Sequence, residues 1–302
     1  MKKLTILFLL ISIFSFAQKA ELKKEISKIT EGKKATVAVS VLGIDFPFQY
    51  NNNNAEKKLP MQSVFKFHIA LAVLDLVDQG KLSLDQKIFI KKSELLPQTW
   101  SPIREKNPEG NFEITLGEAL KWMVSESDNN CTDIILRLID GTKTVQNFLD
   151  DKKIKNTQIK FNEEDCHKIL NLQYQNYTTT KSANNTLKVF FDKELISKNS
   201  TNFLYKLMVE TSTGKNRLVA GIPKGTEVAH RTGTSFTENG ITPAINNIGI
   251  VTLPNGKKYA ISVFVSDSKE NFGVNEKIIS DISKVVYESL NKPKSGFFFN
   301  WK

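Results

Sequence analysis

Cysteine and histidine are both scarce in this chain of 302 residues. Its two cysteines, Cys131 and Cys166, are too few for a disulfide framework, and the sequence leaves open whether they pair. The three histidines, His68, His167 and His230, stand apart and show neither H-x-H nor H-x-x-E-H spacing. The sequence therefore argues against zinc-dependent hydrolysis, and we predict no metal and no cofactor.

Long apolar runs are absent beyond the first residues of the chain. There, Lys2 and Lys3 precede an apolar stretch, Leu4–Phe14, and a small-x-small sequence that ends at Ala17. This order is typical of a secretory signal peptide, so we predict that residues 1–17 are removed and that the protein is periplasmic. A membrane anchor is the alternative, but the apolar run is short for a span. We expect no stable membrane association after the signal is removed.

A basic stripe with interleaved aromatic residues is missing, although the formal charge is +10, or +8 without the two lysines of the signal peptide. The lysine pairs are spread along the chain, which indicates solvated faces and a general attraction for anions rather than a nucleic-acid site. Internal repeats and linkers are missing as well. With 40% apolar residues, the chain can form one large domain or two lobes with a real core, and we expect a monomer.

The rest of the sequence is organised around Leu59–Gly80, which predicts a buried helix. Pro60 suits a first helical turn, because proline has no N–H to leave unpaired there. The residues that follow are apolar almost all round, which favours burial over an amphipathic position. Gly80 is a residue that commonly ends a helix.

Two polar side chains, Ser63 and Lys66, lie at i and i+3 near the start of this helix, on one face. Burial lowers the pKa of a lysine and makes it a possible base, and a serine beside a base is an activatable nucleophile. The alternative is a serine in the first turn with a lysine that extends to solvent. Ser-x-x-Lys alone does not decide between them.

Strands are predicted near both ends of the chain and helices mostly in between. The expected strands are residues 35–42, 46–50, 226–231, 247–253 and 258–265. The expected helices besides the buried one are 19–31, 115–125, 129–139, 142–149, 181–195, 201–210 and 276–290. Residues 83–99 look irregular, and residues 157–177 look like a long loop, a kind of segment that is often functional.

This order predicts a mixed α/β (α+β) fold in which both ends of the chain enter one antiparallel sheet. The sheet has five strands, is flanked by helices and is built from residues 18–58 and 212–302. Residues 59–211 form an all-helical domain that contains the buried helix and the long loop. The active site is expected between the two parts.

Three further segments carry polar side chains that could form a site. Ser127-Asp128-Asn129 lies between two helices, where it either projects into a cleft or caps the second helix. Arg231-Thr232-Gly233-Thr234 ends a predicted strand and offers a cation, hydroxyl groups and a glycine to an anionic substrate, or else is an ordinary edge. Glu163 lies in the long loop, where an ordinary solvated acid is the alternative.

Together these segments resemble the serine β-lactamases of class A, whose motifs S-x-x-K, S-D-N and K-[ST]-G occur in this order. The resemblance covers nearly the whole chain after the signal peptide. The segments LQYQNY (172–177), VETSTG (209–214) and AHRTGTS (229–235) are similar to the PER/CepA-type branch, known for cephalosporin hydrolysis. The resemblance implies a β-lactamase/transpeptidase-like fold and small-molecule β-lactam substrates.

The resemblance also implies catalytic roles. Ser63 would attack the lactam carbonyl, with Lys66 as its base, alone or together with Glu163 through water. Ser127 would pass a proton to the departing lactam nitrogen. Glu163 would activate the water that hydrolyses the acyl-enzyme. The N–H groups of Ser63 and Thr234 would bind the oxyanion.

Substrate-binding roles are implied for a second set of residues. Asn129 would bind the side-chain amide of the substrate, and Trp100 would form a wall of the cleft. The substrate carboxylate would be held along the strand that contains Thr232 and Gly233, with Arg217 as a supporting arginine. The residues that would hold it directly are Arg231, Thr234 and Ser235.

The sequence departs from the family pattern in three places. Arg231 replaces the usual lysine, which keeps the charge but changes its geometry. His167 stands where many members have an asparagine that holds the deacylating water. Glu164 replaces a common proline after Glu163, so we predict a trans Glu163–Glu164 bond, since a cis bond there costs about 3–4 kcal/mol. We also expect a changed loop path and, with the longer segment 236–243, a wider cleft that accepts oxyimino-cephalosporins.

Two relatives of this chemistry remain open, a penicillin-binding D,D-peptidase and a non-catalytic β-lactam sensor. Glu163 argues against the peptidase, which lacks a dedicated deacylating base. A sensor should carry a membrane segment linked to a signalling domain, and the sequence shows none. A histidine-based triad is disfavoured because His68 lies on the core helix. The aromatic tail GFFFNWK (296–302) has no role that we can assign.

Overall fold

The structure, a computed structural model, describes residues 17–292. The predicted signal peptide, residues 1–17, falls almost wholly outside this range, as does the aromatic tail 296–302. A first helix occupies residues 17–30, close to the predicted range of 19–31.

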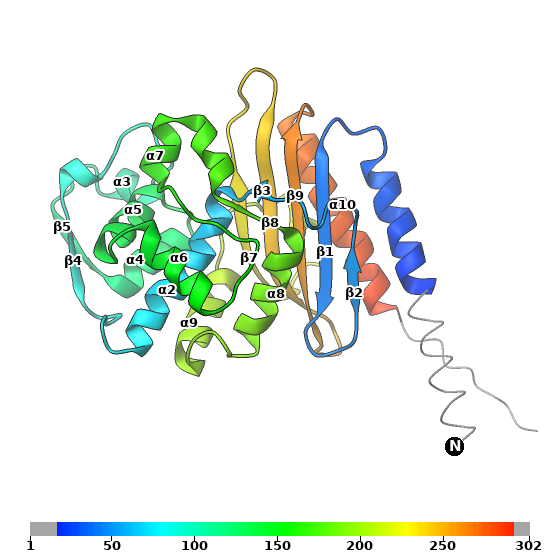
Figure 1. Ribbon diagram of the computed structural model, residues 1–302, viewed down its shortest axis with the longest axis horizontal. Helices are drawn as coiled ribbons and strands as arrows, with labels where there is room; N and C mark the ends of the chain where they lie inside the picture. The colour runs from blue at the N-terminus through cyan, green and yellow to red at the C-terminus, as the bar shows by residue number, and fades with distance from the viewer. Residues whose placement is uncertain (1–16, 293–302) are drawn as a thin grey trace, which may run out of the picture.

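The centre of the molecule is a five-stranded antiparallel sheet with the order β2-β1-β9-β8-β7 (Figure 1). Two strands come from the start of the chain and three from its end, which confirms the predicted fold. Their bounds are β1 Thr36–Gly43, β2 Gln49–Asn51, β7 Val228–Thr234, β8 Thr242–Thr252 and β9 Lys258–Ser268.

One face of the sheet is covered by helix 17–30 and by α10 (Phe272–Asn291), which lie side by side in Figure 1. The apolar residues of this layer alternate along the strands, as in Val37, Val39 and Val41 of β1. An ion pair of 2.9 Å between Lys292 and Glu21 joins the ends of the two helices. Burial of this layer fixes which face of each strand points inward.

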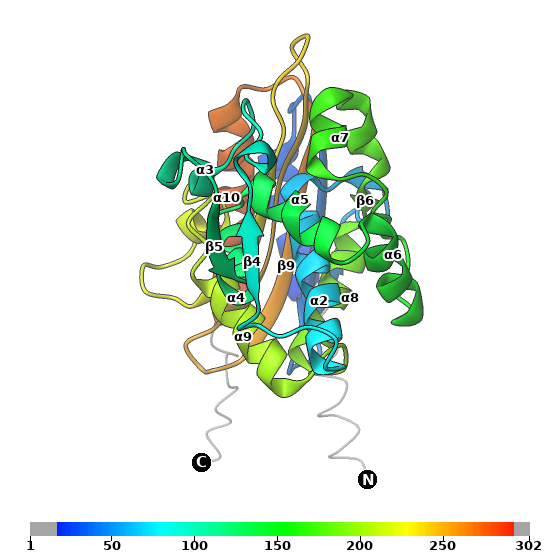
Figure 2. The ribbon, with the colours of Figure 1, turned by 90° about the vertical axis from the view of Figure 1, so that its left-hand side faces the viewer.

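The other face of the sheet meets a larger core that includes most of the remaining helices (Figures 1 and 2). α8 (Thr180–Phe191) lies directly on this face, where Ser262 of β9 donates a hydrogen bond of 2.6 Å to Asn184. The other helices are α2 Phe65–Asp78, α3 Pro102–Lys106, α4 Leu116–Val124, α5 Asn129–Leu138, α6 Thr142–Asp151, α7 Glu163–Lys168 and α9 Lys198–Val209. Short 3₁₀ helices are η1 Gln62–Val64, η2 Lys92–Glu94, η3 Leu170–Gln175 and η4 Leu218–Gly221.

The buried helix is present as α2, and every residue from Phe65 to Leu74 is buried. The predicted start at Pro60 is wrong. Pro60 lies in the two-residue strand β3 (Leu59–Pro60), which pairs with β6 (Tyr177–Thr178). A proline suits this position as well as a first helical turn, because a short edge strand also leaves an N–H unused.

Two segments are more regular than predicted. Residues 83–99 contain β4 (Lys87–Ile90), which pairs with β5 (Phe112–Thr115) across the irregular stretch between them. The loop 157–177 contains α7 and η3. Both elements are short, and their apolar residues are too few to give a clear period in sequence.

The proposed division into residues 18–58 with 212–302 and residues 59–211 stays a prediction. α8 belongs to the second part by sequence and packs on the sheet of the first. Within residues 17–292, no helix is both long and apolar enough to cross a membrane.

His68 of α2 is fully buried, and both of its ring nitrogens lack a hydrogen-bond partner among residues 17–292. Burial lowers the pKa of His68 to about 4, from an ordinary value near 6.5. Between these two pH values the unfolded chain binds a proton that the folded protein does not, so this group lowers stability as the pH falls through that window.

Replacement of His68 by leucine should therefore stabilise the protein, and more so in acid. At pH 5, removing the protonation equilibrium of His68 should by itself raise the free energy of unfolding by about 2 kcal/mol. At pH 8, where the histidine is neutral in both states, the same change should contribute nothing. Urea unfolding of both proteins at pH 5 and pH 8 measures the difference. An equal difference at the two pH values would contradict the expectation.

Candidate active site

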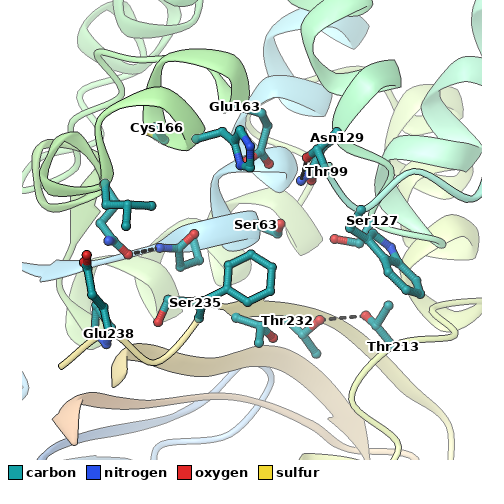
Figure 3. A pocket seen from close by; sticks show the side chains of 18 residues that line it. Ser63, Thr99, Ser127, Asn129, Glu163, Cys166, Thr213, Thr232, Ser235 and Glu238 are labelled. Carbon is teal, nitrogen blue, oxygen red and sulfur yellow. Dashed lines mark hydrogen bonds between the residues drawn. The ribbon is translucent and has the colours of Figure 1, made fainter. Parts of the chain in front are cut away.

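A cavity of about 320 Å³ lies where α7, the turn between α4 and α5, and β7 with its hairpin meet. Ser63 is at the centre of Figure 3, with Glu163 and Asn129 on one side and Thr232 and Ser235 on the other. Most of the predicted site residues line this cavity: Ser63, Trp100, Ser127, Asn129, Glu163, His167, Thr232, Thr234 and Ser235. The others are Lys66, Arg217, Arg231 and Gly233, which are not among its lining residues.

Ser63 lies in η1, which ends directly before α2 begins. The backbone before it is held against the sheet. Asn246 of β8 donates hydrogen bonds to the carbonyls of Pro60 (2.8 Å) and Met61 (3.2 Å). Gly233 of β7 lies so close that a Cβ atom there would come within 2.2 Å of the Met61 carbonyl oxygen. The glycine of the predicted motif thus permits a close approach to Met61.

Lys66 is fully buried, and its ammonium group has several partners. It donates to the Ser127 carbonyl at 2.8 Å and to the side-chain oxygen of Asn129 at 2.5 Å, and it forms an ion pair of 2.9 Å with Glu163. The Ser127 hydroxyl lies 3.5 Å from the same nitrogen. One lysine therefore joins three segments that are distant in sequence.

The environment of Lys66 acts on its pKa in opposite directions. Burial is the largest cause and lowers the pKa from its ordinary value, while the charge of Glu163 raises it and that of Arg231 lowers it. The net shift is downward. This side chain is therefore easier to deprotonate than an ordinary lysine, which is the property that a base needs.

Asp128 fixes the turn that carries Ser127 and Asn129. It caps α5 by accepting a hydrogen bond from the Cys131 N–H at 2.9 Å, and it also accepts the Ile103 N–H at 2.8 Å. The segment Ser127-Asp128-Asn129 therefore does both things that the sequence allowed. Asp128 caps the helix, and its two neighbours line the cavity.

Glu163 is the first residue of α7, and its N–H donates to the carboxylate of Asp133 at 2.9 Å. The next N–H, of Glu164, donates to the other oxygen of Asp133 at 2.8 Å. No peptide bond among the described residues is cis, so the prediction of a trans Glu163–Glu164 bond is confirmed.

Asp133 is not among the site residues predicted from the sequence. Burial, then the charge of Glu163, raise the pKa of Asp133 to about 7. Its position at i+4 from Asn129 on a predicted helix is a signal that could have placed it on the same face.

Arg231 is fully buried in β7, and its Nη2 donates to the Ser127 hydroxyl at 2.5 Å. Its Nε and Nη1 have no hydrogen-bond partner among the described residues. Burial and then the charge of Arg217 lower the pKa of Arg231 to about 9, so it remains a cation at neutral pH. Thr232 shares a hydrogen bond of 2.6 Å with Thr213 (Figure 3).

Arg217 is also buried, behind the strand. Its guanidinium donates to Thr234 Oγ1 at 2.7 Å and to the Gly233 carbonyl at 3.0 Å, and it pairs with Glu276 of α10 at 3.1 Å. Ser235 is held within the hairpin, because its hydroxyl exchanges hydrogen bonds with the backbone of Ala244. Through its hydrogen bond to Thr234, Arg217 orients the Thr234 hydroxyl, and Thr234 lines the cavity.

Trp100 and His167 both line the cavity. Trp100 is half exposed and is held by a hydrogen bond of 2.9 Å from its indole N–H to the Glu126 carbonyl. His167 comes from α7, one turn after Glu163. Cys166 also lines the cavity and, like Cys131, is a free thiol, so the two cysteines do not pair.

Metal chemistry finds no support in the geometry. In the part of the chain that the structure describes, no three histidine, cysteine or acidic side chains are arranged to hold an ion. The cavity instead joins a serine, a buried lysine, a carboxylate and a second hydroxyl.

A model of the β-lactamase enzyme family matches residues 21–290. The chain therefore belongs to this family, and within it to the class A serine β-lactamases.

Individual relatives agree with this. The chain is 46% identical over 295 residues to β-lactamase VEB-1 of Pseudomonas aeruginosa, covering 95% of this chain and 98% of that protein. It is 41% identical to the extended-spectrum β-lactamase PER-1 of the same species, covering 93% of this chain and 92% of that protein. The crystal structure of TLA-3 extended-spectrum β-lactamase superposes with a TM-score of 0.89 at 50% identity, covering 91% of this chain and all of that one.

Proposed function

We propose that this β-lactamase hydrolyses cephalosporins, oxyimino-cephalosporins included, and penicillins through an acyl-enzyme on Ser63, and that it thereby gives antibiotic resistance. The observation that supports this most is the contact of the buried Lys66 ammonium with both Glu163 and the Ser127 turn, beside Ser63. The names of VEB-1, PER-1 and TLA-3 support the extended spectrum.

Acylation begins when Ser63 Oγ attacks the lactam carbonyl carbon and forms a C–O bond. Its proton passes to Lys66, once that lysine is neutral, or through water to Glu163. The oxyanion is bound by the N–H groups of Ser63 and Thr234. The C–N bond then breaks, and the nitrogen takes a proton from the Ser127 hydroxyl. The proton removed from Ser63 returns to Ser127 through Lys66, whose Nζ lies 3.5 Å from the Ser127 hydroxyl.

In deacylation, a water oxygen attacks the acyl carbon and the Ser63 oxygen becomes the leaving group. Glu163 removes a proton from a water molecule, and the resulting hydroxide attacks the ester carbon. The C–O bond to Ser63 breaks, and the Ser63 oxygen takes a proton while Glu163 gives up the one it removed from water, with Lys66, 2.9 Å from Glu163, between them. Asn129 binds the side-chain amide of the substrate, while Trp100 and His167 bound the cleft.

We further propose that the protein acts as a periplasmic monomer after loss of residues 1–17. A D,D-peptidase or a β-lactam sensor would also acylate Ser63 but would deacylate slowly. Steady-state hydrolysis of a chromogenic cephalosporin, followed by intact-protein mass spectrometry, separates these cases. Turnover without a persistent adduct supports the β-lactamase, and a stable stoichiometric adduct contradicts it.

Arg231→Ala should lower kcat/KM for carboxylate-bearing β-lactams by about tenfold to a hundredfold, the loss expected for a charged hydrogen bond. Its two unpartnered buried donors support a role in holding the carboxylate. Arg231→Lys keeps the charge and should recover part of the loss. Unchanged kcat/KM in Arg231→Ala would remove the carboxylate site from this position.

Arg217→Ala should show a milder loss of kcat/KM and a larger loss of stability. The substitution leaves Glu276 without its buried partner, which typically costs about 3–5 kcal/mol. Thermal unfolding and kcat/KM measured on the same preparations separate the two effects. A variant as stable as the wild type would contradict the structural part.

A further inference from the structure

Gln62, the residue before Ser63, has a backbone conformation that is unusual for its type. Its φ angle of 49° lies in the left-handed region, which is unfavourable for residues other than glycine. Such a conformation persists only where the surroundings enforce it. The surroundings of Gln62 therefore show what fixes the position of the nucleophile.

Three contacts enforce this conformation. The Met61 N–H donates to the Asn176 carbonyl at 2.9 Å, and the Met61 carbonyl packs against Gly233 of β7. The side-chain amide of Gln62 donates a short hydrogen bond to the side-chain carbonyl of Gln173, which is buried in η3. We call this Gln62–Gln173 pair the glutamine clamp. Both of its residues line the catalytic cavity.

The Gln173 end of the glutamine clamp is connected to the loop that carries Glu163. η3 is followed by its C-cap residue Asn176, whose side-chain oxygen accepts hydrogen bonds from the N–H groups of Lys160 at 2.8 Å and Phe161 at 3.0 Å. These residues directly precede Asn162, which caps α7. The clamp thus joins the turn that carries Ser63 to the loop that carries the proposed base.

We propose that Gln62 is a positioning residue which, through Gln173, sets the distance between Ser63 and the loop of Glu163, and that it serves deacylation more than acylation. This proposal rests on the proposed function. Acylation with Lys66 as the base uses groups on η1, α2, the α4–α5 turn and β7. Deacylation also requires the loop of Glu163 at the correct distance from the ester to hold a water molecule.

The clamp is not the sole tie between the two segments, because Lys66 also pairs with Glu163 at 2.9 Å. We therefore expect a partial loss on breaking it. In Gln62→Ala, the deacylation rate constant should fall about tenfold, whereas the acylation rate constant should change less than threefold. The fraction of acyl-enzyme at steady state should rise accordingly.

The experiment measures both rate constants by quenched-flow mass spectrometry with a chromogenic cephalosporin. The variants are Gln62→Ala, Gln173→Leu and the double substitution. If the two residues act through each other, the double variant should lose no more than either single one. Gln173→Glu keeps an acceptor oxygen and should retain most of the deacylation rate.

Gln175→Ala is the matched control. Gln175 is in the same 3₁₀ helix, but its side chain accepts a hydrogen bond from Lys160 Nζ, outside the clamp. This variant should deacylate like the wild type.

Additive losses in the double variant, or equal slowing of acylation and deacylation, would overturn the proposal. If Gln62→Ala does not fold by circular dichroism, Gln173→Leu and Gln173→Glu decide alone. Failure of the proposed function is distinguishable, since it would appear in the wild type as an adduct that does not turn over.

Discussion

Ser63→Ala should abolish both β-lactam turnover and covalent labelling. Loss of a serine nucleophile costs roughly 10⁴-fold or more in kcat. Ser63 lines the cavity and precedes the buried Lys66 by three residues on the same chain segment. Lys66 would remain paired with Glu163 in the variant, so the fold should be kept.

The measurement combines the initial rate of a chromogenic cephalosporin with intact-protein mass spectrometry after long incubation. Ser93→Ala is a suitable control, because Ser93 is an exposed serine in another 3₁₀ helix, η2, and does not line the cavity. It should behave as the wild type. An adduct on any other residue of the Ser63→Ala protein would overturn the assignment of the nucleophile.

Glu163→Ala should trap the acyl-enzyme. A general base typically contributes 10²–10⁴-fold, so we expect deacylation to slow by about 10³-fold and acylation by less. Mass spectrometry should then find the protein with one persistent acyl group. Glu164→Ala is the control, since its carboxylate pairs with Lys168 on the surface of α7.

A second readout follows from the electrostatics of the pair. The charge of Glu163 raises the pKa of Lys66, so its removal should lower that pKa further below its ordinary value. The acid limb of the acylation rate should therefore move to lower pH in Glu163→Ala. Wild-type turnover in this variant would make Glu163 an ordinary loop acid and favour the peptidase or the sensor.

The site could be predicted from sequence where each residue acts through its own chemistry. Ser63 and Lys66 are polar residues at the start of a helix that the sequence predicts to be buried, which is unusual. Asp128 is a typical N-cap residue and indicates the start of α5. The structure brings Asn129 and Glu163 within hydrogen-bond distance of Lys66.

Residues that act through the backbone could not be predicted. Asp133 holds two N–H groups of α7, and Asn246 holds two carbonyls beside Ser63. The i+4 spacing from Asn129 can place Asp133 on a helix face, but local sequence does not show which backbone groups either residue binds. Their partners lie in other segments of the chain. Such roles depend on tertiary contacts, which a single sequence does not show.

Helices and strands could be predicted where the sequence has a clear hydrophobic period or a strong capping motif. Thr115 and Glu118 form a capping box at the start of α4, a pattern that the sequence itself shows. Pro60 misled the prediction because proline is compatible with a first helical turn and with an edge strand, and the pairing of β3 with Tyr177 decides between them.

The order of strands in the sheet constrains how the chain folds. β1 pairs with β9, and Ser40 lies opposite Ser262, more than 200 residues later in the chain. Closing a loop of that length costs about 5 kcal/mol of chain entropy before any contact of the sheet compensates it. The neighbouring helices α4 and α5 contact each other within a short stretch of chain and need no such closure. We expect them to gain protection from hydrogen exchange first, while β1 waits for the last strand to be synthesised.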